Sequence, residues 1–473
     1  MNKIDKFFGI SEKGSTFRAE IVAGLTTFMT MVYILMVNAG FFSMIPGLSY
    51  GGMYIATAIG AIVGTLLMAF LAKMPLAQAS GMGVNAFIVF TIVFGLGLSY
   101  ANAMVFTLLD GVIFILLTVT GLRKKIFEAI PAAVRKGIGV GIGLFIAFIG
   151  FQNAGVIVNN DSTLVELVSF NFLGTATYAG LIGPFVAIAG VVAIAILSKK
   201  NVKGAILWGI LGAAVLYYIM NAIGLIFNLA ACQAVFESIS LANPFSAFGA
   251  WGKESVGKVF TEGFNFSGYL GIENNTVGGL VLLVITTALS LCMIDMFDTI
   301  GTLYGACEQG NLLDKDGTPL NFEKCMLSDA IATCAGAIAG TSTVTTFVES
   351  SAGVAAGGKT GFTALVVAIC FALAMFLSPI AELIPSAATA SALIWVGVLM
   401  MKGVSQTDWS DYAEAIIVFA TFIVMCLGYS ISKGIGAGLI VYIFVMLFTG
   451  KVKEIKIATW VISAIYLATF LLT

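Results

Sequence analysis

Runs of about 20 apolar residues recur along the whole chain, and they limit the possible folds more than any other feature. A helix needs about 20 apolar residues to cross the hydrocarbon core of a bilayer. This length predicts seven spans, near residues 19–42, 52–72, 77–97, 103–121, 137–158, 178–198 and 204–231. Seven more are predicted near 279–306, 325–340, 342–357, 361–378, 386–403, 412–431 and 434–450. We therefore expect an all-α polytopic membrane protein with about 14 transmembrane spans.

Composition excludes several other classes of protein. Hydrophobic residues make up 59% of the chain and charged residues 10%, which excludes a soluble globule. The net charge of −1 leaves no basic surface for nucleic acid. With no histidine and no CxxC pair among seven cysteines, we expect no metal site and no cofactor, and we interpret the cysteines as packing residues. A last apolar segment, 457–472, is too short to assign as a span, and it is expected to lie along the interface or to pack on the bundle.

The positions of the cations predict the orientation in the membrane. Lys and Arg gather in cytoplasmic loops. A cytoplasmic N-terminus places 20 of the 23 Lys and Arg residues on the cytoplasmic side, and only Lys253, Lys258 and Lys433 on the other. Because each half has an odd number of spans, the second half starts from the opposite side of the membrane. The halves are therefore predicted to be inverted repeats.

The third span of each half has an unusual composition for a lipid-facing helix. Residues 78–90 carry Gln78, Ser80, Gly81, Gly83 and Asn85, while 340–351 are rich in threonine, serine and β-branched residues. We interpret spans 3 and 10 as broken helices, and such paired interruptions indicate the binding site of a transporter. The alternative is that small residues there only allow close helix packing.

Carboxylates within the predicted spans mark the candidate site. A charge at the bilayer centre is costly and is tolerated mainly where it faces the bundle interior. Asp295 and Asp298 in the eighth span and Glu349 in the tenth are the strongest candidates, and all three are candidates for proton coupling because the chain has no histidine. Thr302 shares an edge of the helix with Asp298. Asp110 in the fourth span is a weaker candidate, and its alternative role is a structural hydrogen bond or a pairing with the neighbouring half.

Five motifs carry a resemblance to a known family. They are 18-RAEIVAGLTTFMTMVYIL-35, 81-GMGVNAF-87, 295-DMFDTIGT-302, 340-GTSTVTTFVES-350 and 392-ALIWVGVLMM-401. Together they make the chain similar to the AzgA-like branch of the nucleobase–cation symporter family, the guanine, hypoxanthine and adenine permeases. The resemblance covers nearly the whole chain.

This resemblance implies the fold of uracil-type transporters, with a core domain that moves against a gate domain, and a homodimeric assembly. The expected divisions are 1–121 (core, first repeat), 122–231 (gate, first repeat), 232–278 (extracytoplasmic loop), 279–380 (core, second repeat), 381–450 (gate, second repeat) and 451–473 (C-terminal apolar segment).

The resemblance also implies functional positions. Asn85, Asp298 and Glu349 match the family's substrate site, and Asp411 matches a further functional aspartate. A purine has N–H donors and acceptors along its edges, so Glu349 can accept N–H bonds while backbone groups of the adjoining Val348 and Ser350 contribute to the same site. Desolvation of Asp298 would favour its protonated form, which suits a proton carrier. Phe87 or Phe347 could stack on the ring, although most of the 37 phenylalanines are core or lipid-facing residues.

The sequence thus predicts a purine permease of the cell membrane, coupled to protons, rather than an enzyme. Its expected partners are a purine nucleobase, a proton and the lipid bilayer. The first alternative is an anion transporter or channel of the same fold, in which Asp298 and Glu349 would repel the substrate. An intramembrane enzyme of the prenyl-transfer kind would need two magnesium-binding aspartate clusters, and Asp295 with Asp298 form only one.

Overall fold

The protein is predominantly helical, as its apolar runs predict. The computed structural model describes residues 3–121, 130–171, 176–239, 243–271, 276–309, 312–315 and 318–472. Before residue 230 the helices are α1 (Lys3–Phe8), α2 (Phe17–Met31), α3 (Tyr33–Phe42), α4 (Tyr50–Leu67), α5 (Met82–Ala86), α6 (Tyr100–Val119), α8 (Ala132–Asn153), α9 (Tyr178–Lys199) and α10 (Ala205–Ile226). π-Helical turns extend α4 over Met68–Ala72 and α5 over Phe87–Gly95.

Four short helices lie in the predicted extracytoplasmic loop, and a second set of helices, some long and some short, follows. The short ones are α11 (Ala230–Glu237), α12 (Pro244–Glu254), α13 (Lys258–Thr261) and α14 (Ser267–Leu270). The second set is α15 (Val277–Gln309), α16 (Phe322–Ala339), α17 (Ser350–Ala355), α18 (Gly361–Ala374), α19 (Ser378–Ala381), α20 (Ser386–Met400), α21 (Lys402–Ser405), α22 (Tyr412–Leu427), α23 (Ile431–Phe448) and α24 (Ile457–Leu472).

Among the described residues, ten helices are long and apolar enough to cross a membrane, and the shorter apolar helices Met82–Gly95, Tyr412–Leu427 and Ile457–Leu471 accompany them. The protein is therefore a multi-pass membrane protein. The count of 14 spans is not confirmed, because spans 3 and 10 contain extended backbone and α16 carries charged residues. The segment predicted at 457–472 forms α24, where Tyr466 Oη lies 2.6 Å from Ser290 Oγ of α15.

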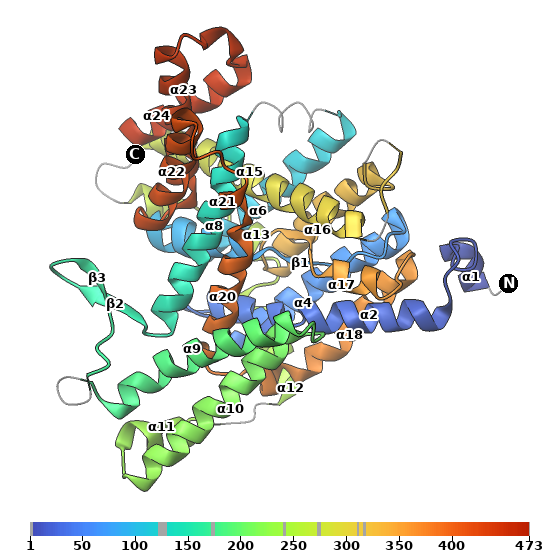
Figure 1. Cartoon of the computed structure of the whole chain (residues 1–473), viewed down its shortest axis with the longest axis vertical. Helices are drawn as coiled ribbons and strands as arrows, with labels where there is room; N and C mark the ends of the chain where they lie inside the picture. Colours follow the sequence, from blue (N-terminus) through green and yellow to red (C-terminus); the bar gives the residue numbers. More distant parts are fainter. Residues whose placement is uncertain are drawn as a thin grey trace.

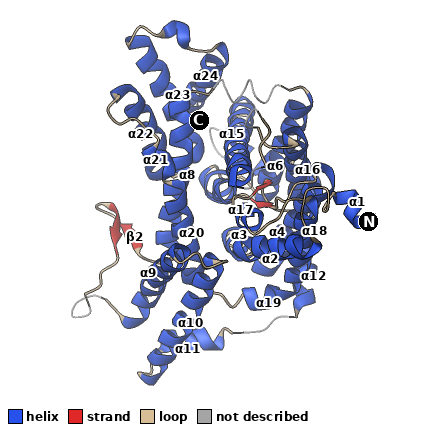
Figure 2. Cartoon of the chain, turned by 45° about the vertical axis from the view of Figure 1, so that its right-hand side comes forward, coloured by secondary structure: helices blue, strands red, loops and turns tan. Residues whose placement is uncertain are grey.

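The long helices form two groups (Figure 2). In the first group α2, α4, α6, α16 and α18 pack together around the central strands, and in the second α8 packs against α20, α22 and α23, and α9 against α10 and α20. Figure 1 shows the N-terminus beside α1, at the edge of the first group, and the C-terminus beside α24. The grouping agrees with the core and gate division, whose boundaries stay predictions. Residues 122–129, which hold three of the counted cations, lie outside the described residues.

Glycines on α8 allow close packing in the second group. A Cβ added at Gly143 would lie 2.5 Å from Met400 Cβ of α20, and one at Gly137 would lie 2.6 Å from Thr421 Cβ of α22. Small residues let helix backbones approach one another where no hydrophobic force drives association in lipid. Helix α8 can thereby pack closely against α20 and α22.

A short antiparallel strand pair lies inside the first group of helices. Strand β1 (Gln78–Ser80) pairs with β4 (Val344–Thr346) in the register Gln78↔Thr346 and Ser80↔Val344, and all six residues are buried. This pair confirms that spans 3 and 10 are broken helices, and its antiparallel direction is what inverted repeats require. A second strand pair, the hairpin of β2 (Ile157–Asn160) and β3 (Leu164–Leu167), projects away from the helices (Figure 1).

Candidate functional site

The two broken spans meet at the strand pair, which satisfies backbone groups that the helices leave unpaired. The pairing continues beyond the strands, because Gly81 N donates to Thr343 O at 3.1 Å and Phe347 N donates to Ala77 O at 3.0 Å. Non-helical backbone at membrane depth needs such partners, since no water is available in the hydrocarbon region. Helix α5 (Met82–Ala86) follows β1 after Gly81, and α17 (Ser350–Ala355) follows β4 after residues 347–349, so two helix starts lie close to the strand pair.

A cavity of about 780 Å³ lies beside these helix starts, between the two groups of helices. The broken segments line it with residues 81–83 and 346–349, and α15 lines it with Ile294, Asp298, Ile300 and Thr302. The opposite wall is made of Ala132, Arg135, Lys136, Ile138, Gly139 and Ile142 of α8, Val396, Leu399 and Met400 of α20, and Gln406. The lining is mostly apolar, and its charged members are Asp298 of α15, Glu349 of the second broken segment, and Arg135 and Lys136 of α8.

Asp298 lies against the end of β1. A Cβ added at Gly81 would lie 3.2 Å from Asp298 Oδ2 and 3.3 Å from Thr345 Oγ1, so the absence of a side chain at Gly81 allows the carboxylate to approach the strand. Thr302 donates its hydroxyl to the Asp298 backbone carbonyl at 2.8 Å. The structure therefore places both residues of this i, i+4 pair in the cavity wall.

Glu349 is held from the first span. Its Oε1 accepts a hydrogen bond from Tyr33 Oη at 2.7 Å, and its backbone carbonyl accepts one from Thr30 Oγ1 at 3.4 Å. Phe347 and Val348, which precede it, also line the cavity. Ser350 does not, because its hydroxyl accepts a hydrogen bond from Ala77 N at 3.0 Å behind the strand.

Two predicted site residues on the third span lie outside the cavity lining. Asn85 is fully buried, and its Oδ1 accepts a hydrogen bond from Ser342 Oγ, while Nδ2 has no partner in the described part of the chain. Phe87 is fully buried in the hydrophobic core. Their assignment to the substrate site stays a prediction.

The three other predicted carboxylates also lie outside the lining. Asp295 is buried one turn before Asp298 on α15, and Asp110 is buried on α6, which packs against α16. Asp411 is exposed and caps the start of α22, where it accepts a hydrogen bond from Ala413 N at 2.9 Å. That contact is the ordinary role of an aspartate before a helix.

Two residues near the site were not predicted from the sequence. Asp329 of α16 is buried and accepts hydrogen bonds from Gln78 Nε2, from Thr299 Oγ1 at 2.5 Å and from Thr346 Oγ1 at 3.1 Å. The sequence could have indicated Asp329, because it is a carboxylate inside an apolar run, the same feature that makes Asp298 a candidate. Tyr33 had no comparable signal, because a tyrosine in a span is most often a packing residue.

A charged cluster lies where α8 and the α21–α22 connection border the cavity. Lys136 Nζ lies 2.7 Å from Glu414 Oε1 and donates to Gln406 O at 2.7 Å. Hydrogen bonds from the Ser410 hydroxyl and backbone N–H hold the pKa of Asp408 below its usual value, so this loop stays anionic. The ion pair joins α8 to the first turn of α22 beside the cavity.

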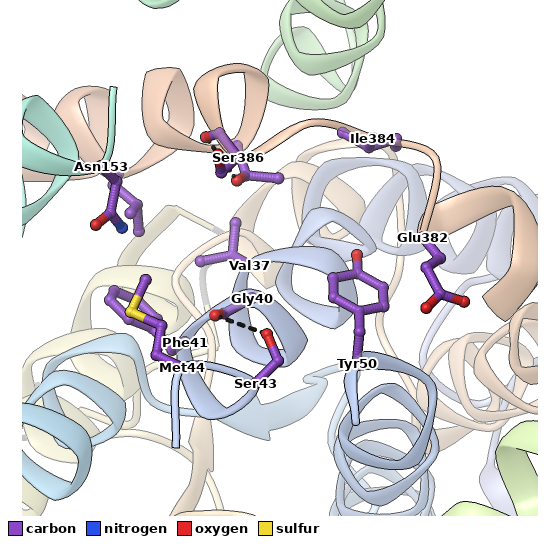
Figure 3. Close-up of a pocket in the computed structure, with 12 residues that line it drawn as sticks. Val37, Gly40, Phe41, Ser43, Met44, Tyr50, Asn153, Glu382, Ile384 and Ser386 are labelled. Carbon is purple, nitrogen blue, oxygen red and sulfur yellow. Dashed lines mark hydrogen bonds between the residues drawn. The ribbon is translucent and has the colours of Figure 1, made fainter. Parts of the chain in front are cut away.

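A second cavity of about 370 Å³ lies at the other end of α20 (Figure 3). Tyr50 and Glu382 stand at one side of it, and Phe41, Met44 and Asn153 at the other. Helix α20 lines both cavities. Leu393 belongs to the smaller one and Val396 to the larger, so about one helical turn separates the two along α20.

Paired broken spans that meet beside a cavity are the geometry of a transporter's binding site. The Permease family matches residues 18–437. The protein belongs to this family. It is a transporter rather than an enzyme, and the family assignment confirms the resemblance drawn from the five motifs.

Relatives of this permease match along nearly its full length. The guanine/hypoxanthine permease PbuO of Bacillus subtilis is 38% identical over 452 residues, covering 95% of this chain and 96% of PbuO. The adenine permease AdeQ of Escherichia coli is 34% identical over 466 residues, covering 98% of this chain and 95% of AdeQ. The transmembrane domain of the cyanobacterial bicarbonate transporter BicA shares the fold of the permease, with a TM-score of 0.59, 15% identity and coverage of 88% of this chain and 96% of that domain.

Proposed function

We propose that this permease imports purine nucleobases, among them hypoxanthine, guanine or adenine, by proton symport. The names of PbuO and AdeQ support the substrate class, because both relatives cover at least 95% of this chain. The observation that carries the proposal is the meeting of Glu349 and Asp298 beside the two helix starts in one largely apolar cavity.

The chemistry of that cavity suits a neutral planar ring. Glu349 can accept N–H bonds from one edge of a purine, since Tyr33 occupies only Oε1. The first N–H groups of a helix have no intrahelical partner, so the start of the helix Met82–Gly95 can donate to ring nitrogen or carbonyl acceptors. Phe347 and Ile142 supply apolar contact to the ring faces.

Proton coupling is assigned to a carboxylate because the chain has no histidine. Asp298 lies at the cavity wall, where desolvation opposes its charged form. Binding of a proton on one side of the membrane and its release on the other would link purine import to the proton gradient. We propose no metal and no cofactor for this cycle.

We place the permease in the cell membrane as a homodimer with a cytoplasmic N-terminus. Arg135 and Lys136 line the larger cavity, and cations gather on the cytoplasmic side of membrane proteins. The larger cavity would then open toward the cytoplasm, and the smaller one would lie on the outer side. The anion alternative is less well supported, because Asp298 and Glu349 would repel an anion and the likeness to BicA concerns the fold alone.

Uptake of radiolabelled hypoxanthine, guanine and adenine into proteoliposomes, with cross-competition and with and without an uncoupler, tests this proposal. We expect Glu349→Gln to weaken purine binding by about tenfold or more, because it removes a charge-assisted acceptor worth about 1.5–3 kcal/mol. Glu237→Gln on α11, which is exposed, is the matched control and should behave as the wild type. Bicarbonate uptake without purine uptake, or unchanged purine binding by Glu349→Gln, would contradict the proposal.

A further inference from the structure

The two carboxylates in the cavity wall are held differently by the protein. Glu349 Oε1 accepts a hydrogen bond from Tyr33 Oη at 2.7 Å. No described residue donates a hydrogen bond to the Asp298 carboxylate, whose Oδ2 would lie 3.2 Å from a Cβ at Gly81. Glu349 therefore has a hydrogen-bond partner on its carboxylate, whereas within the described part of the chain Asp298 is bonded through its backbone carbonyl.

Tyr33 lies in the first span, at the junction of α2 and α3, where Val32 keeps helical backbone angles. It is fully buried and is the first residue of α3, separated from the end of α2 by Val32 alone. Thr30, in the last turn of α2, donates its hydroxyl to the Glu349 backbone carbonyl at 3.4 Å. The first span thus brings one contact to the side chain of Glu349 and another to its backbone.

The chemistry of this contact sets its direction. A carboxylate can only accept hydrogen bonds, so the Tyr33 hydroxyl is the donor. Hydrogen bonds to an ionised acceptor are roughly twice as strong as neutral ones. With Oε1 occupied and its orientation set, Glu349 keeps Oε2 as the acceptor that remains for a ligand in the cavity.

We propose that Tyr33 is a positioning residue that fixes Glu349 as the substrate acceptor and leaves the change of protonation during transport to Asp298. This inference rests on the proposed function, which it deepens by dividing two roles between the two acids. Tyr33 does not itself line the cavity, so it acts on the substrate through Glu349.

A double-mutant cycle tests the inference on purified protein, with hypoxanthine binding as the readout. We expect Tyr33→Phe to weaken binding by about tenfold, and the double variant with Glu349→Gln to be weakened little more than Glu349→Gln alone. In the Asp298→Asn background, Tyr33→Phe should cost the same factor as in the wild type. Tyr54→Phe is the matched control, because Tyr54 is also buried and its hydroxyl donates to Ala374 O at 3.1 Å, outside the cavity lining.

The outcomes separate the possible failures. Losses that multiply in the Tyr33→Phe, Glu349→Gln double variant, or a Tyr33→Phe protein that binds as the wild type, would overturn the positioning role. Unchanged binding by Glu349→Gln alone would instead overturn the proposed substrate site. If Tyr33→Phe does not reach the membrane, Tyr33→His serves as the second variant, because it keeps a ring N–H donor. A folded Tyr33→His protein that loses more than about threefold in hypoxanthine affinity would also count against the inference.

Discussion

Asp329 joins both broken spans to the eighth, and removing its carboxylate should loosen the site. Its Oδ1 accepts from Gln78 Nε2 of β1 and from Thr346 Oγ1 of β4, and its Oδ2 accepts from Thr299 Oγ1 of α15. All four residues are buried. Asp329→Ala leaves these three donors without their acceptor, whereas Asp329→Asn keeps the oxygen that Gln78 and Thr346 share.

The three contacts give the expected magnitude. Hydrogen bonds to a charged acceptor are worth about 1.5–3 kcal/mol each, which sets an upper limit of about 5–9 kcal/mol for Asp329→Ala. The two threonine hydroxyls can turn to other acceptors, so most of the destabilisation comes from the buried Gln78 amide that is left without its acceptor. We expect Asp329→Ala to lower the free energy of unfolding by about 3–5 kcal/mol. Asp329→Asn should lower the free energy of unfolding by about 1–2 kcal/mol. Only the contact with Thr299 is reversed, because the new amide nitrogen donates where the carboxylate oxygen accepted, and the buried charge is removed.

Thermal unfolding in detergent, followed by tryptophan fluorescence, measures this order. We expect Asp329→Ala to unfold at a clearly lower temperature than Asp329→Asn, and Asp329→Asn slightly below the wild type. Asp161→Ala, in an exposed turn, serves as the control for loss of a carboxylate. An Asp329→Ala protein that unfolds with the wild type would refute the reasoning, and equal losses for Ala and Asn would show that charge rather than acceptor geometry matters.

Three further variants test transport. Asp298→Asn should retain purine binding and counterflow exchange but lose uncoupler-sensitive accumulation. Accumulation driven by a pH gradient in this variant would exclude Asp298 as the obligatory proton site. Asn85→Ala should alter the ranking of hypoxanthine, guanine and adenine in competition assays while the protein stays in the membrane, and equal losses for all three would argue against recognition. Gly83→Val should slow counterflow more than it weakens binding, because an added Cβ would lie 2.9 Å from Ile142 Cγ2 of α8, across the boundary between the helix groups. Gly212→Val on α10, where a Cβ meets no atom within 4 Å, is its control, and equal exchange rates would show that this contact does not limit movement.

Much of the fold could be predicted from the sequence, because the membrane leaves a chain few choices. Apolar runs of spanning length must become helices, and hydroxyl-rich or glycine-rich runs must leave the helix only where protein surrounds them. These two rules predicted broken spans within 78–90 and 340–351, where the structure has the strands at 78–80 and 344–346. They also drew attention to Asp298 and Glu349, which the structure brings into one cavity. The span count was less predictable, since hydropathy does not distinguish a crossing helix from a segment that turns within the protein.

The sequence by itself determined which segments are apolar, which spans are interrupted and which acids lie at membrane depth, because these are local properties of residue type and spacing. Only the tertiary structure decided what those acids contact. Tyr33 reaches Glu349 across 316 residues and Gln78 reaches Asp329 across 251, and no spacing rule relates side chains so far apart. Such pairs form because the inverted halves fold against each other and bring the broken spans together, and buried polar groups then take the partners that the packed helices place within reach.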